Sequence, residues 1–232
     1  MITICSGMMR SASTWAFNIA RMISQGLYGD VQAQYCNIGD IDAVIANASG
    51  PMVIKAHYPS RDAMVGILSG RFRNIYTIRD PRDCYVSRRA FVPTETPAES
   101  LSVIMAAKPY AEVFLSFPDR SLIIRYEDVI SSPAHVIQSI GEYMGAGISI
   151  TQAQIMSRNT SPKEVKKFTA CFRNMATTAT ADGHLVEENT QFHSNHITDG
   201  RAGRWKTDLL AEDRDFVLTE EMTEFAEMLG YE

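Results

Sequence analysis

The chain opens on the run ITICSGMMRSASTW, residues 2–15, and this run decides the fold that we expect. Its first part is short, apolar and rich in isoleucine, which is typical of a buried strand. Residues 14–25 then carry the spacing of an amphipathic helix. A strand, a loop of small residues and a helix N-terminus together hold phosphate on backbone N–H groups. The run therefore predicts a phosphate-binding loop at the first strand-to-helix connection.

The loop departs from GxxxxGK[ST], the pattern of many nucleotide hydrolases and kinases. Gly7 and Thr14 fit the ends of that pattern, but Ala12 and Ser13 replace its glycine–lysine pair. The nearest basic residue is Arg10. An ATP-hydrolysing or kinase site normally places the lysine on the β- and γ-phosphates, so the departure counts against such a site. The run is also compatible with an ordinary first turn whose serines cap the helix.

Short apolar runs alternate with longer amphipathic ones along the rest of the chain. We expect strands near residues 2–5, 31–36, 52–56, 74–78 and 121–125, and helices over 14–25, 61–69, 81–91, 98–117, 133–144 and 212–229. Strands that alternate with helices imply parallel crossovers. We therefore expect one α/β domain over residues 1–232, a three-layer sandwich around a central parallel sheet. The polar stretch 177–203 is expected to be irregular, and it is long enough to be a functional lid or to be partly disordered.

Composition excludes several classes of protein. A chain of 232 residues that is 45% hydrophobic and 21% charged is neither disordered nor dependent on disulfides. The net charge of −5 provides no global positive field for nucleic acid or for an anionic membrane. Sixteen of the 22 basic residues are arginine, the side chain suited to forked phosphate recognition. An anionic ligand would therefore be held by a local cluster of basic groups.

The cysteines and the start of the chain indicate a reducing compartment. Cys5, Cys36, Cys84 and Cys171 are widely spaced without a CxxC pair, so we expect buried thiols. The apolar opening is short and lacks the basic region of a signal peptide, and no stretch has the length of a membrane span. We expect a cytoplasmic protein without a membrane span, a monomer or a homodimer.

A second candidate segment is KAHYP, residues 55–59, at the end of an expected strand. Lys55 and His57 are two residues apart, so both side chains leave the same face of the strand. If this strand neighbours the first, both point toward the phosphate loop. A histidine there can take a proton from an attacking hydroxyl, and a lysine can neutralise developing charge. A lone histidine at a strand end is otherwise an ordinary structural residue.

The third segment is RDPRDCYVSRR, residues 79–89, where the arginines cluster. A strand delivers Arg79, and a helix that starts near Pro81 carries Ser87, so both side chains can converge on one phosphate. Asp80 and Asp83 are expected to cap the helix or to pair with Arg82. Two separate phosphate sites would imply a ligand that is phosphorylated at both ends.

Together these runs resemble the sulfotransferases that use 3′-phosphoadenosine-5′-phosphosulfate (PAPS). Residues 10–15 resemble the PKSGTTW loop, residues 55–59 are similar to KTHLP, and residues 79–87 resemble RNPKDxxVS. Residues 126–128 match YED, residues 160–167 look like TSFKEMKK, and residues 200–206 resemble the tail of RKGxxGDWK. The six segments follow the family's order along nearly the whole chain.

The resemblance implies a P-loop-like sulfotransferase fold and a PAPS-dependent sulfotransferase activity. The sulfuryl group would move to a hydroxyl or amine of a small-molecule acceptor and release adenosine 3′,5′-bisphosphate (PAP), with no metal required. His57 would be the general base, with Arg10 and Lys55 as further catalytic residues. The implied cofactor-binding residues are Arg10, Ser11, Ala12, Ser13, Thr14, Trp15, Arg79, Ser87, Tyr126, Thr160, Ser161, Gly200, Arg201 and Gly203.

Three positions depart from the family's pattern. Arg10 replaces the loop lysine and keeps its charge without its compact ammonium. Residues 198–199 replace an Arg–Lys pair, so Arg201 or Arg204 would have to restore a cation near the 3′-phosphate. Pro162 stands where an adenine-stacking phenylalanine is usual.

Two other functions stay open: a P-loop small-molecule or nucleotide kinase, and a non-catalytic protein that binds adenosine bisphosphate. The pair His193-x-x-His196 suggests zinc, but no matching Cys pair or acidic triad accompanies it. The segment with Lys163, Lys166, Lys167 and Arg173 is either a solvated basic face or a rim for an anionic ligand.

The acceptor pocket is expected from residues 91–117 and 177–198. Four aromatic residues either line that pocket or belong to the core: Phe91, Tyr110, Phe114 and Phe192.

Overall fold

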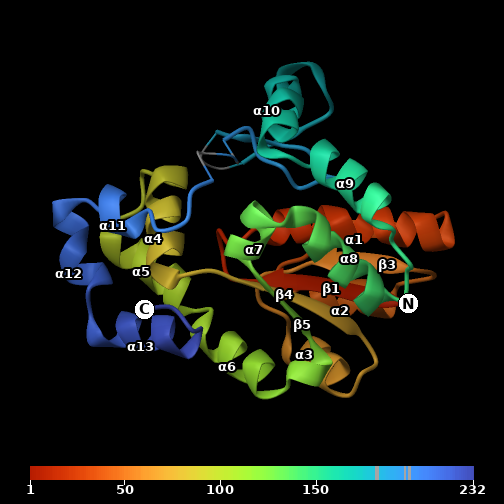
Figure 1. The fold of residues 1–232 in the computed structure, drawn as a ribbon, viewed down its shortest axis with the longest axis horizontal. Helices are drawn as coiled ribbons and strands as arrows, with labels where there is room; N and C mark the ends of the chain where they lie inside the picture. Colours follow the sequence, from red (N-terminus) through yellow and green to blue (C-terminus); the bar gives the residue numbers. More distant parts are fainter. Residues whose placement is uncertain (181–182, 196, 198–199) are drawn as a thin grey trace.

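Five parallel strands form one sheet at the centre of the molecule (Figure 1). The computed structural model describes residues 1–232 except 181–182, 196 and 198–199. The strands lie in the order β2-β3-β1-β4-β5, and their bounds are β1 Ile2–Gly7, β2 Gln32–Tyr35, β3 Met52–Lys55, β4 Arg73–Ile78 and β5 Leu122–Arg125. The expected parallel α/β sheet is confirmed. Because the strands are parallel, the carboxyl ends of β1, β3 and β4 meet at one edge.

Alternate residues of each strand enter the cores on the two faces of the sheet. Ile4 of β1 and Ile54 of β3 join one core with helices α3 (Arg61–Leu68), α6 (Lys108–Ser116) and α13 (Glu220–Met228). Their neighbours Cys5 and Val53 join the other core, against α1 (Ser13–Tyr28) and α8 (Pro133–Met144). Helices therefore cover the sheet on both sides, which explains why its inner strands β1, β3 and β4 are almost continuously buried.

Local signals set several helix boundaries where the sequence predicts them. Helix α4 (Pro81–Phe91) begins at its proline, and Asp80 accepts a hydrogen bond from Arg82 N at its N-terminus. Helix α8 ends at Gly145, whose φ of 79° is the left-handed conformation that glycine adopts without strain. The remaining bounds are α2 Ile41–Ala46, α7 Tyr126–Ser131, α9 Ile150–Asn159, α10 Pro162–Ala170, α11 Trp205–Asp208, β6 Thr178–Ala179 and β7 Leu185–Val186.

Two expected helices are each broken in the structure. The run 98–117 forms α5 (Pro97–Met105) and α6, because Pro109 sits in the first turn of α6 and cannot continue a preceding helix. The run 212–229 forms a short helix α12 (Arg214–Val217) before α13, which starts afresh where Thr219 caps it. The apolar spacing continues across both breaks, so periodicity alone did not reveal them.

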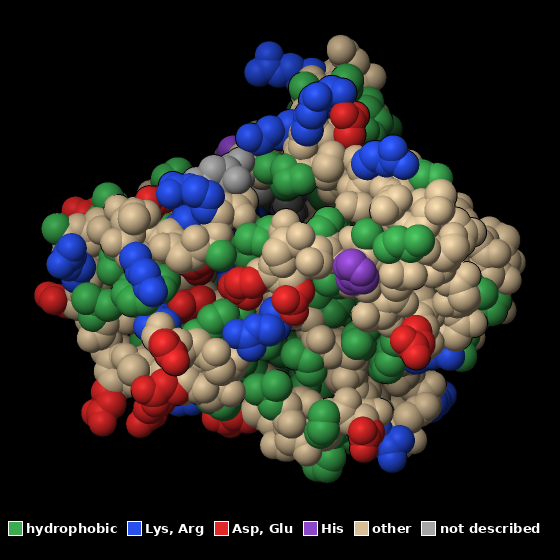
Figure 2. Space-filling view, viewed as in Figure 1, with side chains coloured by type: hydrophobic (Ala, Val, Ile, Leu, Met, Phe, Trp, Pro, Cys, Tyr) green, Lys and Arg blue, Asp and Glu red, His purple; other side chains and the backbone are tan. Residues whose placement is uncertain are grey.

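A cap, here the described residues 150–180, 183–195 and 197, lies over the sheet edge beyond α1 (Figure 1). It contains α9, α10 and the short antiparallel pair β6–β7, so part of the stretch expected to be irregular forms paired strands. Its own apolar cluster is small and centres on Val165, Phe172 and Phe192. Lys and Arg side chains gather over this part of the surface (Figure 2).

The thiols and the helices test two smaller expectations. Cys5, Cys36 and Cys84 are buried as expected, but Cys171 is exposed, because it follows α10, of which only Val165 is buried. Among the described residues, no helix combines the length and the apolar character needed to cross a membrane.

Candidate active site

The phosphate loop is pressed against strand β4. A Cβ on Gly7 would lie 2.1 Å from Thr77 Oγ1 and 2.7 Å from the Thr77 carbonyl oxygen, so only glycine fits there. Met8 N donates to the Thr77 carbonyl at 3.0 Å. Ser11 Oγ donates to the Met8 carbonyl at 2.6 Å and lies 2.7 Å from Thr77 Oγ1. The hydroxyl of Ser11 therefore braces the loop, and its backbone N–H is the group it can offer to a ligand.

Left-handed residues then turn the loop into the N-terminus of α1. Arg10 and Ala12 have φ values of 67° and 71°, a conformation that costs residues other than glycine about 1–2 kcal/mol. Backbone turns of this kind form nests of N–H groups that bind anions. Ser13 and Thr14 follow in the first turn of α1, whose N-terminus has no side-chain cap. The N–H groups in the first turn of a helix have no partner within the helix, and together with the helix dipole they favour an anion at this point.

Lys55 places a buried positive charge beside the loop. It ends β3 in register with Cys5 of β1, and only 5% of its surface is exposed. No described carboxylate pairs with its ammonium, whose nearest ring contact is Tyr35 at 5.6 Å. Burial, followed by the charge of Arg10, lowers the pKa of Lys55 to about 7. An anion beside this ammonium would remove the cost of burying it.

His57 is held in one tautomer. Its Nδ1 lies 3.0 Å from the Gly7 carbonyl oxygen. Because a carbonyl can only accept, Nδ1 carries the proton and Nε2 is the basic nitrogen. Burial, followed by the charge of Lys55, lowers the pKa of His57 to about 3, so the ring is neutral near pH 7. Strand β3 ends before His57, but the turn still places both side chains in one cavity.

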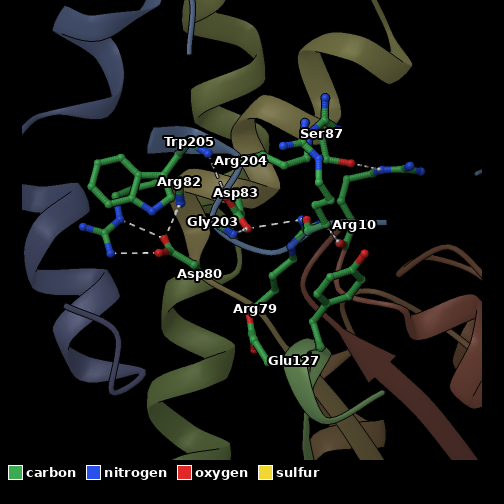
Figure 3. Close-up of polar contacts among 12 residues, drawn as sticks. Arg10, Arg79, Asp80, Arg82, Asp83, Ser87, Glu127, Gly203, Arg204 and Trp205 are labelled. Atoms are coloured by element: carbon green, nitrogen blue, oxygen red, sulfur yellow. Dashed lines mark hydrogen bonds and ion pairs between the residues drawn. The ribbon is translucent and has the colours of Figure 1, made fainter. Parts of the chain in front are cut away.

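Arg79 is the centre of a buried polar network (Figure 3). Its Nη2 donates to Asp83 Oδ2 at 3.2 Å and to the Arg201 carbonyl at 2.9 Å. Its Nη1 donates to the Arg10 carbonyl at 3.1 Å, and its guanidinium lies 3.9 Å from the ring centre of Tyr126. Arg79 thus connects the phosphate loop, helix α4 and the segment that follows the cap.

Ser87 contacts Arg10 rather than Arg79. Its Oγ accepts from Arg10 Nε at 3.1 Å, and the same guanidinium lies 4.3 Å from the ring centre of Phe91. Burial, followed by the charge of Arg79, lowers the pKa of Arg10 to about 10. The expected convergence of Arg79 and Ser87 on one phosphate stays a prediction, with Arg10 lying between them.

The two aspartates of the third segment have different partners. Asp80 caps α4 and pairs with Arg82 at 2.8 Å, as expected for an acid beside a helix N-terminus. Asp83 is fully buried and pairs with Arg79 instead. The expectation of a cap or a pair with Arg82 is therefore confirmed for Asp80 and wrong for Asp83.

The opposite wall of the site comes from α1, α7, the cap and the segment after it. Trp15 Nε1 donates to Thr160 Oγ1 at 3.0 Å, and the Tyr126 hydroxyl donates to the Gly200 carbonyl at 2.8 Å. Ser161 caps α10 by accepting from Glu164 N. The wall is therefore fixed by hydrogen bonds between segments that are far apart in the sequence.

Arg201 and Arg204 share one carboxylate. Asp208 Oδ2 lies 3.2 Å from Arg201 Nη2 and 2.8 Å from Arg204 Nε. Hydrogen bonds from Thr207 and then from Arg204 hold the pKa of Asp208 at about 2. Residues 198–199, where the family's Arg–Lys pair is missing, lie outside the described residues.

These elements enclose a cavity of about 420 Å³, called the central cavity below. Every residue predicted for the site lines it except Ser11 and Gly203, whose backbone N–H donates to Asp83 at 2.7 Å. Met9, Arg88 and Ile130, which the sequence reasoning did not assign to the site, also line it, as do His193 and Ile197 of the stretch expected for the acceptor pocket. Arg88 pairs with Glu95. Its place directly after Ser87 in the third segment was the only signal that could have found it.

The aromatic candidates for the acceptor pocket divide into two groups. Phe91 and Phe192 line the central cavity. Phe114 is fully buried against Tyr76, with ring centres 4.8 Å apart, and Tyr110 packs on Tyr58 at 5.2 Å. The second pair therefore belongs to the core.

The suggested zinc pair cannot be traced as a pair, because His196 lies outside the described residues. His193 contacts Phe91, with ring centres 5.4 Å apart. In the part of the chain that the structure describes, no three His, Cys, Asp or Glu side chains gather as a metal site would need.

Known proteins match both the sequence and the fold. The family model of the sulfotransferase domain matches residues 11–228. Cytosolic sulfotransferase 3 of Arabidopsis thaliana is 20% identical in an alignment of 206 residues that covers 79% of this chain and 64% of that protein. The chain thus spans slightly less than two thirds of the length of this relative.

Two solved structures share the fold. A retinol dehydratase in complex with androsterone and PAP has a TM-score of 0.64 at 17% identity, covering 99% of this chain and 79% of that chain. The mouse sulfotransferase SULT7A1 complexed with PAP has a TM-score of 0.67 at 15% identity, covering 100% and 88%. At these identities the likeness concerns the fold. With the family match over most of its length, the chain belongs to the sulfotransferase domain family.

Proposed function

We propose that the protein transfers the sulfuryl group of PAPS to a hydroxyl or amine of a small-molecule acceptor, with His57 as general base. The observation that carries this proposal is the hydrogen bond from His57 Nδ1 to the Gly7 carbonyl. It leaves the basic Nε2 on a neutral ring, in the same cavity as the phosphate loop. A protein that only bound a nucleotide would have no use for a base fixed at this point.

The residues of the central cavity fit a ligand with several negative charges. Lys55 is buried without a described carboxylate partner, and the pKa values of Lys55 and Arg10 are both lowered by burial and by neighbouring cations. Arg79 Nε is also buried, without a hydrogen-bond partner among the described residues. An anion in this cavity would satisfy unpaired donors and separate like charges.

When bound, PAPS would supply the sulfuryl group and an adenosine bisphosphate leaving group. The backbone N–H groups of the first turn of α1, with Ser13 and Thr14, would hold the phosphate at the leaving end. Lys55 and Arg10 would stabilise charge that develops there. His57 Nε2 would take the proton of the attacking acceptor, and the Gly7 carbonyl would steady the imidazolium through Nδ1–H. Arg79 would contribute by orienting the donor.

Two findings on relatives support the choice of donor and acceptor. The retinol dehydratase and mouse sulfotransferase structures hold PAP. The retinol dehydratase was also solved with androsterone or with retinol, which are small molecules. The name of the plant relative supports a cytoplasmic location.

Calorimetry with PAP and with ATP–Mg²⁺ tests the donor. We expect PAP to bind more tightly, because the loop lacks the lysine that contacts the β- and γ-phosphates of ATP. Tighter binding of ATP–Mg²⁺ would instead favour a kinase and overturn the proposal. If PAP binds, incubation with labelled PAPS and panels of phenols, alcohols and amines should transfer label to an acceptor. Binding of PAP without transfer to any of them would favour a non-catalytic binder.

A further inference from the structure

We infer that Asp83 is a positioning residue for the donor, because its carboxylate holds in place both the guanidinium of Arg79 and the backbone of residues 200–205. This inference rests on the proposed function and adds a residue to it. Asp83 is fully buried in the first turn of α4, and it does not line the central cavity. It therefore acts through other residues rather than by touching a ligand.

Three donors from distant parts of the chain meet on this one carboxylate (Figure 3). Arg79 Nη2 lies 3.2 Å from Oδ2, and the N–H of Gly203 donates to the same oxygen at 2.7 Å. The N–H of Trp205 donates to Oδ1 at 2.9 Å. A carboxylate is acceptor-only, so it can receive all three at once, whereas an amide would turn N–H groups against some of these donors.

The backbone of the segment is shaped to reach Asp83. Gly203 has a φ of 74°, and a Cβ there would meet nothing within 4 Å. Glycine is therefore required for the backbone conformation that turns this N–H inward, and not for space. The segment holds Arg201 and Arg204, both of which line the central cavity. By accepting hydrogen bonds from Gly203 and Trp205, Asp83 fixes the backbone positions from which the side chains of Arg201 and Arg204 extend.

The same carboxylate also fixes the direction of Arg79. With Nη2 held by Asp83 and the Arg201 carbonyl, and Nη1 by the Arg10 carbonyl, the guanidinium cannot rotate. Its Nε keeps no partner among the described residues. Asp83 therefore connects Arg79, at the end of β4, with residues 200–205, which lie more than a hundred positions later in the chain. The positions of the cations on both segments thus depend on the same carboxylate.

The test compares Asp83→Asn with the matched change Asp80→Asn. Asp80 belongs to the same motif and to a similar buried pair with arginine, but neither Asp80 nor Arg82 lines the central cavity. We expect D83N to weaken PAP binding by about 10- to 100-fold, the size of a lost hydrogen bond to a charged group. D80N should bind PAP nearly as the wild type does. At saturating PAPS, the KM for the acceptor should be unchanged in D83N.

A second pair of variants keeps the test valid if D83N does not fold. Gly203→Ala strains only the backbone that presents the N–H to Asp83, and it should weaken PAP binding in the same direction. Gly29→Ala is its control, since Gly29 has a similar φ of 78° and equally open surroundings at the end of α1. Equal PAP affinity in G203A and G29A, or equal losses in D83N and D80N, would overturn the inference.

Hydrogen exchange separates this inference from the proposed function. In ligand-free protein, exchange at the amides of Gly203 and Trp205 should accelerate in D83N and not in D80N. Unchanged exchange at both amides in D83N would overturn the role of Asp83, whatever the protein binds. A wild-type protein that shows protected amides but no affinity for PAP would instead refute the proposed function.

Discussion

Two regions line the central cavity, the edge of the sheet and the cap, and they are held in place differently. The sheet edge rests on buried groups such as Ser11, Arg79 and Asp83, each with several hydrogen bonds to other segments. The cap depends on a small apolar cluster and on single connections such as Trp15–Thr160 and Asn195–Phe91. The comparison indicates that groups needing fixed geometry lie at the sheet edge.

Charge differs between the two regions as well. Residues 150–175 of the cap carry five basic residues and one acidic residue, although the whole chain has a net charge of −5. Lys163, Lys166 and Lys167 are exposed on α10, next to Ser161 and Pro162, which line the central cavity. The basic groups at the sheet edge are buried, so they act at short range, whereas those of the cap act through solvent and are screened by salt.

The largest effect is expected from the two histidines of the cavity. His57→Ala should lower sulfuryl transfer by about 100- to 10,000-fold, the range for removing a general base, while PAP affinity stays close to wild type. His193→Ala, which changes a histidine of the cap in the same cavity, should reduce the rate far less. Single-turnover transfer and calorimetry measure the two quantities. Equal losses of rate in both variants would contradict the assignment of His57, rather than a histidine of the cap, as the general base.

A loss of stability should distinguish two arginines. Arg79→Ala leaves Asp83 buried without its ion-pair partner and is expected to lower the free energy of unfolding by about 3–5 kcal/mol. Arg173→Ala removes an exposed side chain of the cap and should change it by less than about 0.5 kcal/mol. Urea unfolding measures both values. An R79A variant with the free energy of unfolding of the wild type would show that the network around Asp83 does not stabilise the sheet edge.

The pH dependence of PAP binding should report on Lys55. Because the pKa of Lys55 is about 7 in the ligand-free protein, the amine loses its charge above that pH, and an anionic ligand must restore the proton. Affinity should therefore fall by up to about tenfold per pH unit above pH 7, with proton uptake on binding. His57, with a pKa of about 3, stays neutral throughout this range.

The same shift changes stability with the opposite sign. Between about pH 7 and 10 the unfolded chain binds more protons than the folded one, so the free energy of unfolding should rise with pH.

The proton uptake that accompanies PAP binding is measured by calorimetry in two buffers of different ionisation enthalpy. Lys55→Met should abolish it, and Lys163→Met in the cap should not. Proton uptake that persists in K55M would assign the titration to another group.

The smallest effect is expected at the surface of the cap. Replacing Lys163 and Lys166 by alanine should slow PAP association by about threefold to tenfold at low ionic strength, and the difference should vanish at high salt. Dissociation and the thermal midpoint should hardly change, because both side chains are exposed and neither forms an ion pair with another described residue. Stopped-flow binding over a salt series measures this. A change confined to dissociation would place these lysines in direct contact with the ligand.

Local sequence predicted most elements of the fold, because their signals lie within one turn or one strand. Pro81 and Pro133 marked the first residues of α4 and α8, and short apolar runs marked four of the five strands of the sheet, whereas β2 is polar and largely exposed. The predictions were wrong where long amphipathic runs continued across a break, as at the start of α6. A boundary set by packing against other elements leaves no periodic signal.

The sequence by itself determined the parallel fold and which residue types collect at the sheet edge, because alternation, glycine placement and motif order are local properties of the chain. Only the tertiary structure decided how these residues are used. In the folded protein the Ser11 hydroxyl hydrogen-bonds within the loop, and Arg10 donates to Ser87. Asp83 accepts from Arg79 and from backbone groups more than a hundred residues away. The reason is physical: a buried hydrogen-bond partner is chosen by proximity in the folded core, and proximity across such separations is not encoded in any local spacing.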